Sequence, residues 1–175
     1  MTVTSRRLPA LALLLALGAC GLTPRGGGQE FPAAAAPRFD PMAFFTGRLK
    51  GEGRLNKLFS AATAVRVDST GHVEDGVLHL AQVIHEGEKP ARRREWTMRE
   101  VSPGRYRGAL DDAVGPVTLE ATGNRLHIAF TMKGGLPVEQ WLTLSPDGRT
   151  ANNILKVRKF GLTVAVLSET IRKAD

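Results

Sequence analysis

The side chains best suited to chemistry in this sequence are a few polar and aromatic residues inside strand-like stretches. Arg94 alternates with Trp96 and Met98, so in an extended strand the three share one face, which we expect to be the inner face. A buried guanidinium needs an anionic partner, because an unpaired charge is costly to bury. That partner is either Asp111 or Asp112, or the head group of a bound acidic amphiphile. A structural salt bridge, or an arginine at the mouth of the fold, is the simpler alternative.

Asp111 and Asp112 are not expected to form a paired-carboxylate site. Adjacent residues of a strand point to opposite faces, so only one of them can point inward. Acid and base catalysis by two carboxylates needs both groups at one centre. The pair precedes Ala113-Val114-Gly115, where a bend is expected, and aspartates often accept hydrogen bonds from local backbone amides in bends. Turn capping is therefore the favoured role.

Asn153, Trp96 and Trp141 are further candidates for ligand binding. Asn153 shares its inward parity with Leu155 and Val157. A buried amide in this position can bond a ligand or a neighbouring strand, and the second is commoner. The two tryptophans can line a cavity or simply fill space.

The histidines show no metal-binding pattern. His79 and His85 share one face of a strand but lie roughly 20 Å apart at about 3.3 Å per residue, too far to share an ion. His72 and His127 have no partner nearby in sequence. No Gly-x-Ser-x-Gly elbow and no phosphate-binding glycine loop is present. We therefore expect neither a metal nor a cofactor, and no motif points to catalysis, although scattered residues can form an enzyme site in a barrel.

A period of two dominates the chain from Gly47 onward and predicts strands to carry these side chains. It is clearest over 125–132, where Leu126, Ile128, Phe130 and Met132 share one side. The predicted strands cover residues 48–55, 64–68, 76–85, 92–101, 104–111, 117–121, 125–132, 138–145, 151–159 and 162–172.

Short gaps with turn residues between these strands predict antiparallel hairpins, because parallel strands need long crossovers. One short helical turn is expected around Asp40 to Phe45, with Asp40 as its cap and Pro41 at its first position. Nine or ten sequential strands with one apolar face predict an all-β, antiparallel up-and-down barrel over 40–175, which removes exposed edges. A sandwich is the alternative.

The N-terminus carries an export signal. Arg6 and Arg7 precede an apolar run over 8–17, which at roughly ten residues is too short to span a bilayer. The run ends in Leu17-Gly18-Ala19-Cys20, which resembles the lipobox of bacterial lipoproteins, and Cys20 is the only cysteine in the chain. We expect a cleaved signal over 1–19 and a lipid chain on Cys20 that holds the protein on a membrane.

A stretch rich in Gly, Ala and Pro follows and predicts a flexible tether over 20–39. Gly21, in place of the aspartate that retains similar lipoproteins at the inner membrane, favours the inner leaflet of the outer membrane, facing the periplasm. The formal net charge of +7 falls by two when Arg6 and Arg7 leave with the signal. A basic domain is attracted to anionic lipid, while export argues against nucleic acid as a partner.

Several short motifs, taken in order, resemble a family of Gram-negative lipoproteins in the domain-of-unknown-function series, number 3833. The motifs are Phe44-Phe45-Thr46-Gly47, Arg94-Glu95-Trp96, Tyr106-Arg107-Gly108-Ala109-Leu110-Asp111-Asp112, Gly123-Asn124-Arg125-Leu126, Trp141-Leu142 and Lys159-Phe160-Gly161. The resemblance covers roughly 44–173 and implies a calycin-like, lipocalin-type barrel with no established activity. It adds Tyr106 to the candidate ligand-binding residues.

Together these features predict a non-catalytic, membrane-anchored lipoprotein whose barrel binds or shuttles a hydrophobic or amphiphilic molecule such as a lipid or fatty acid. An envelope scaffolding protein that uses its basic outer surface is the alternative. A lipid-processing enzyme is the third possibility.

Overall fold

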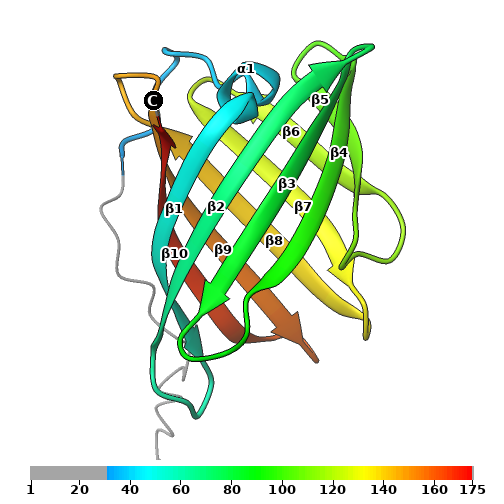
Figure 1. Cartoon of the computed structure of the whole chain (residues 1–175). Coiled ribbons are helices and arrows are strands. Elements are labelled where there is room, and N and C mark those ends of the chain that lie inside the picture. The colour runs from blue at the N-terminus through cyan, green and yellow to red at the C-terminus, as the bar shows by residue number, and fades with distance from the viewer. Residues whose placement is uncertain (1–30, 175) are drawn as a thin grey trace, which may run out of the picture.

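Ten antiparallel strands close into one barrel in the computed structural model, which describes residues 31–174 (Figure 1). The strands are β1 (Gly47–Lys57), β2 (Thr63–Glu74), β3 (Val77–Glu86), β4 (Arg92–Ser102), β5 (Arg105–Leu110), β6 (Val117–Thr122), β7 (Arg125–Met132), β8 (Leu136–Leu144), β9 (Thr150–Lys159) and β10 (Leu162–Ala174). Each strand pairs with its neighbours in sequence, and β1 pairs with β10 to close the sheet. The predicted up-and-down barrel is confirmed, and the sandwich is excluded.

The two-residue alternation seen in the sequence becomes the inside and outside of the barrel wall. In β7, Leu126, Ile128 and Phe130 are buried, while Arg125 is exposed. In β4, Trp96 and Met98 are buried on the inner face. The other predicted strands match the observed ones closely, but the pattern predicts β2 only over 64–68, whereas the strand runs to Glu74 with Ser69 and Gly71 at inward positions where apolar residues are expected.

A short helix, α1 (Pro41–Phe45), lies over one end of the barrel (Figure 1). As predicted, Asp40 caps it, since Oδ1 accepts hydrogen bonds from the amides of Met42 at 2.9 Å and Ala43 at 3.2 Å. Phe44 and Phe45 are buried and pack together with ring centroids 5.1 Å apart. We call this end, which also carries the turns after β2, β4, β6 and β8, the closed end.

The C-terminal strand fastens α1 in place. The Nζ of Lys173 in β10 donates to the carbonyls of Ala43, Phe44 and Thr46 at 2.7 to 3.0 Å.

Within residues 31–174 no helix has both the length and the apolar character needed to cross a membrane.

The chain before α1 runs against the barrel rather than away from it. The Asn124 side chain accepts from the Ala34 amide at 2.7 Å and donates to the carbonyls of Pro32 and Leu144 at 3.0 Å. Phe39, 3% exposed, joins the core. The part of the predicted tether that the structure describes, 31–39, is thus held in place, in contrast to the expectation that it buries almost nothing. The predicted signal, Cys20 and the rest of the tether lie outside the described residues.

The core is not evenly distributed along the barrel. A large apolar cluster, which includes Leu49, Leu119 and Leu126, fills the half next to α1. A much smaller cluster of Val65, Val67 and Ile84 lines the other half. We call this second end, with the turns after β1, β3, β5, β7 and β9, the mouth end.

Candidate functional site

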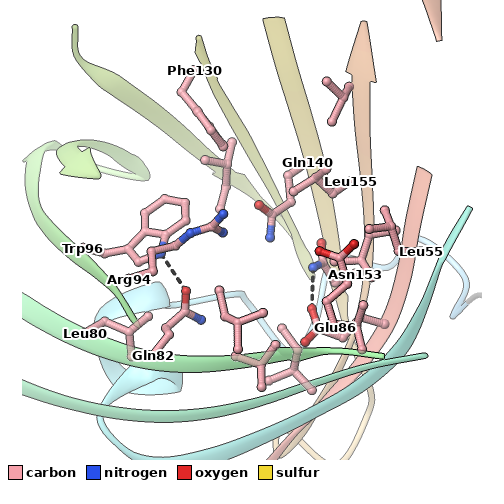
Figure 2. Close-up of a pocket in the computed structure, with 18 of the residues that line it drawn as sticks. Leu55, Leu80, Gln82, Glu86, Arg94, Trp96, Phe130, Gln140, Asn153 and Leu155 are labelled. Carbon is pink, nitrogen blue, oxygen red and sulfur yellow. Dashed lines mark hydrogen bonds between the residues drawn. The ribbon is translucent and has the colours of Figure 1, made fainter. Parts of the chain in front are cut away.

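A cavity of about 280 Å³ occupies the barrel interior toward the mouth end (Figure 2). This volume lies near the lower end of the roughly 300–1,000 Å³ found for small-molecule pockets. Most of its wall is aliphatic or aromatic and includes Leu80, Ile84, Phe130, Leu155, Val157 and Leu167. Strand alternation places these side chains inward, where they leave the cavity between them.

Arg94 is the main charged group inside the cavity, and Asp112 neutralises it. Its Nε and Nη2 atoms lie 2.9 and 2.7 Å from Oδ2 of Asp112, which also accepts from Nη1 of Arg92 at 3.0 Å. Burial lowers the pKa of Arg94, and Arg92 adds to this effect, while Asp112 opposes it. Burial alone would raise the pKa of Asp112, but the two arginines outweigh it and lower that pKa. One carboxylate thus serves two guanidinium groups and leaves an excess positive charge.

Glu169 is a buried carboxyl group on the opposite wall. Its Oε2 accepts from Nδ2 of Asn153 at 2.9 Å, and Gly51 on β1 leaves room for its Oε1. Burial raises the pKa of Glu169, and the Asn153 bond and the charge of Arg94 only partly oppose this. The Oδ1 atom of Asn153 has no hydrogen-bond partner among the described residues. This oxygen is itself fully buried, so it is an unsatisfied acceptor within the wall beside the cavity.

Three more polar side chains line the cavity or support it. Nε1 of Trp96 donates to Oε1 of Gln82 at 2.8 Å, and Nε2 of Gln82 donates to Oγ of Ser69 at 3.2 Å. Figure 2 shows Arg94 and Gln140 reaching into the same space from opposite walls. The cavity thus combines an apolar wall with a polar belt, which consists of Gln82, Arg94, Gln140, Asn153 and Glu169.

An ion-pair cluster borders the opening. Oε1 of Glu86 lies 2.6 Å from Nζ of both Lys57 and Lys89. The hydrogen bonds from Lys57 and then Lys89 lower the pKa of Glu86. The border of the cavity is therefore positively charged on balance.

The structure brings some predicted site residues together. Arg94, Trp96 and Asn153 line the cavity, and Asp112 bonds Arg94, which was one of the partners considered. Asp111 is exposed and accepts from the amide of Glu95 on the neighbouring strand β4 at 2.9 Å, which is a cross-strand bond and not the local turn cap that the sequence favoured.

Two other predicted residues lie elsewhere. Trp141 is on the outer wall, where it stacks on His127 with centroids 5.0 Å apart and lies 5.4 Å from Nζ of Lys156. The reason is parity, because its neighbours Gln140 and Leu142 point inward. Tyr106 is buried in the core beyond the cavity, and burial followed by the Glu100 charge raises its pKa to about 12.

Glu169, Gln140 and Gln82 are the cavity residues that the sequence interpretation missed. Each one occupies an inward position between two apolar residues, as Glu169 does between Leu167 and Ile171. A search for polar residues in the apolar register of each strand would have found all three.

His72 and His79 meet on adjacent strands with rings stacked 5.2 Å apart, although neither has a partner nearby in sequence. Among residues 31–174, no three His, Cys, Asp or Glu side chains gather in a way that could hold a metal ion.

Fold and cavity together define a lipocalin-like β-barrel, and comparisons with known proteins agree. The family model described as "Protein of unknown function (DUF3833)" matches residues 28–173, so the chain belongs to that family. No curated protein matches the chain.

Three solved structures share the fold. An S-type phycobiliprotein lyase, CPES, from Guillardia theta has a TM-score of 0.59 and 6% identity, covering 77% of this chain and 90% of that one. A protein of unknown function from the DUF3598 family of Nostoc punctiforme has a TM-score of 0.54 and 9% identity, covering 80% and 51%. Rv2717c from M. tuberculosis has a TM-score of 0.54 and 13% identity, covering 78% and 99%. At these identities the likeness shows the fold alone.

Proposed function

We propose that this protein is a lipid-anchored envelope lipoprotein whose barrel binds an amphiphilic molecule with an acidic head group, such as a fatty acid. The observation that carries the proposal is the cavity itself, an apolar chamber with Arg94 inside it. The bonds to Asp112 use two of the nitrogens on a guanidinium that has five N–H donors in all. A carboxylate or phosphate head group would accept from the others, while its chain contacts the aliphatic wall.

The polar belt supports a head group of this kind. Burial raises the pKa of Glu169, which reduces the tendency of that side chain to offset the positive charge around Arg94. Gln140 lies in the same chamber, and its amide can bond a head group or an accompanying water. The scaffolding alternative predicts a filled interior, which this cavity does not fit.

Ligand binding can be tested with the chain from residue 20 onward, carrying Cys20→Ser so that no acyl group is attached. Native mass spectrometry without detergent should reveal a bound amphiphile, and a fluorescent fatty acid should be taken up. Arg94→Met should weaken uptake by about tenfold, the loss expected for one charge-assisted contact. Arg93→Met is the matched control, since Arg93 is the next residue of β4 and is exposed. Equal uptake by the two variants, or no uptake by the unmodified barrel, would contradict the proposal.

The anchor and the location are proposed on the sequence pattern around Cys20. Labelled palmitate should attach to the exported chain and be absent from a Cys20→Ser variant. Fractionation of the envelope should recover the acylated protein with the outer membrane. Palmitate that attaches equally to both chains would reject Cys20 as the anchor.

One observation favours a second candidate, a lipid-processing enzyme. Glu169 is a buried carboxyl group that lines the cavity and has a raised pKa, the kind of group that acts in general acid or base catalysis. Hydrolysis of a fluorogenic fatty-acid ester that is lost in Glu169→Gln would support this candidate. No turnover, with ligand uptake intact, would leave binding as the function.

A further inference from the structure

Two phenylalanines stand at hairpin tips of the mouth end, almost fully in solvent. Phe59, in the turn between β1 and β2, is 89% exposed, and Phe160, in the turn between β9 and β10, is 93% exposed. Leu162, next to the second tip, is 66% exposed. None of these side chains contributes to the core, so the fold does not explain their apolar character.

Backbone conformation makes the two phenylalanines more unusual. Phe59 has φ of 61° and Phe160 has φ of 50°, the left-handed region in which a bulky side chain is disfavoured and Gly, Asn or Asp is preferred. The turn between β2 and β3 at the closed end shows the ordinary solution, since Asp75 holds φ of 49° there. At both mouth tips an aromatic side chain occupies a position where backbone energetics and solvation each favour a small polar one.

The two tips lie side by side on the rim of the cavity. β1 pairs with β10, and the amide of Leu58 donates to the carbonyl of Val164 at 2.9 Å, which continues this ladder into the turns. Leu55 and Leu167, on the same two strands, line the cavity. Figure 1 shows the β1–β2 hairpin reaching beyond the other turns of this end. The strands that carry the exposed tips therefore also form part of the cavity wall.

Lysines accompany both tips. Lys57 precedes Phe59 by two residues, and Nζ of Lys159 lies 5.5 Å from the Phe160 ring centroid. An aromatic side chain beside a long cationic one suits a membrane interface, where the ring enters the acyl boundary and the ammonium group reaches lipid phosphates. Lys159 is placed for this role, whereas the ammonium of Lys57 pairs with Glu86. Narrow projecting tips suit a deformable bilayer better than a protein surface, because stable protein interfaces bury roughly 800 Å² of contiguous surface on each partner.

We propose that Phe59, Phe160 and Leu162 insert into the surface of an anionic bilayer and so place the cavity mouth against the membrane. This docking rests on the proposed ligand binding. It adds the route of the ligand, which would pass directly between the bilayer and the barrel without crossing water. The anchor allows this orientation. Ten residues lie between Cys20 and Phe31, so the eleven steps along the chain span at most about 40 Å when extended, comparable to the roughly 36 Å of an eleven-residue strand.

Vesicle binding tests this docking in the chain from residue 20 onward with Cys20→Ser, which retains every described residue. Co-sedimentation with mixed phosphatidylcholine and phosphatidylglycerol vesicles should exceed that with phosphatidylcholine alone. The double variant Phe59→Asn/Phe160→Asn should lower the partition coefficient by about tenfold or more, because two aromatic side chains no longer enter the interface. Val73→Asn/Val101→Asn, which alters exposed apolar residues of the closed end, is the matched control and should bind like the unmodified chain.

The same variants separate docking from folding and from ligand binding. Since Asn tolerates positive φ, the Phe59→Asn/Phe160→Asn variant, here the rim variant, should have a Tm no lower than that of the unmodified protein. Its uptake of a soluble fluorescent fatty acid should be unchanged, so failed docking and failed ligand binding give different results. Equal partitioning of rim and control variants would overturn the proposal. The proposal would also be overturned if the unmodified chain bound no vesicles but self-associated, and the rim variant did not self-associate. In that case a second copy of the chain would cover the exposed phenylalanines.

Discussion

At the scale of single residues, the interior is governed by how each buried charge is balanced. Arg94 and Glu169 face the same chamber but are handled differently. Arg94 keeps its charge because Asp112 pairs with it, whereas Glu169 has only the Asn153 amide within hydrogen-bond distance and burial favours its neutral form. The pairing of Arg94 and the raised pKa of Glu169 on the opposite wall both favour an anion in the cavity.

Glu169 should make folding stability depend on pH. Its folded pKa is raised, so the native state holds a proton that the unfolded chain releases, and stability is fully present below the ordinary pKa of 4.5. As pH rises from there toward the raised folded pKa, the free energy of unfolding should fall by up to about 1.4 kcal/mol per pH unit. Urea melts from pH 4 to 8 measure this, and Glu169→Gln should remove the slope. An unchanged slope would show that another group causes it.

Asp112 should carry a stability contribution of the opposite sign. Its folded pKa is lowered, so the contribution is present above the ordinary pKa of 3.8 and is lost as pH falls through the lower folded value. At neutral pH, Asp112→Asn should destabilise the barrel by about 1–3 kcal/mol, because Arg94 loses its partner. Asp111→Asn is the control and should cost less, since Asp111 is exposed and accepts from one amide. Equal losses in chemical denaturation would argue against the pair.

At the scale of elements, Gly51 and Gly53 of β1 let β10 approach closely while Glu169 of β10 points into the barrel. A Cβ at Gly51 would meet only the side chain of Glu169, while a Cβ at Gly53 would meet the backbone of Ser168 and Glu169. The contact at Gly51 depends only on the Glu169 side chain, whereas the contact at Gly53 depends on the backbone of β10.

That difference predicts a double-mutant result. Gly51→Ala should destabilise the barrel by about 1–3 kcal/mol, as overpacking does, and the loss should shrink in a Glu169→Ala background. Gly53→Ala should cost as much in either background, because its contact is with backbone. Denaturation of the four variants and their parents measures both couplings. Additive losses for the Gly51 pair would refute the packing role of that glycine.

The helical turn α1 depends on its cap. Asp40→Ala should lower the free energy of unfolding by about 1 kcal/mol, because two amides of the first turn lose their acceptor. Asp40→Asn keeps an acceptor and should be nearly neutral. Thermal melts of the two variants provide the comparison, and equal losses would show that the charge rather than the cap matters.

At the scale of the whole molecule, the barrel is packed at one end and hollow at the other. α1 and the large apolar cluster fill the closed end, and the two exposed phenylalanines lie on neighbouring hairpins of the mouth end. Because closure of β1 on β10 makes the wall continuous, a ligand can enter only where packing is absent.

Ligand occupancy should therefore stabilise the whole barrel. A fatty acid present at about one hundred times its dissociation constant should raise the free energy of unfolding by about 2.7 kcal/mol. Differential scanning fluorimetry should show this as a rise in Tm that grows with ligand concentration and is reduced in Arg94→Met. A fatty alcohol should give a smaller shift, since it has no charge for Arg94. A Tm that does not respond to any amphiphile would contradict binding in the cavity.

The sequence by itself determined the strands, their antiparallel order, the capped turn at Asp40 and the inward placement of Arg94, Trp96 and Asn153. These follow from local rules, because a period of two and short turns act between neighbouring residues. Only the tertiary structure decided that Asp112 rather than Asp111 pairs with Arg94, that Trp141 faces outward, and that the barrel is hollow toward its mouth. Those outcomes depend on the register between strands and on the closure of the barrel. Both bring together residues that are far apart in the sequence, which a local alternation pattern does not connect.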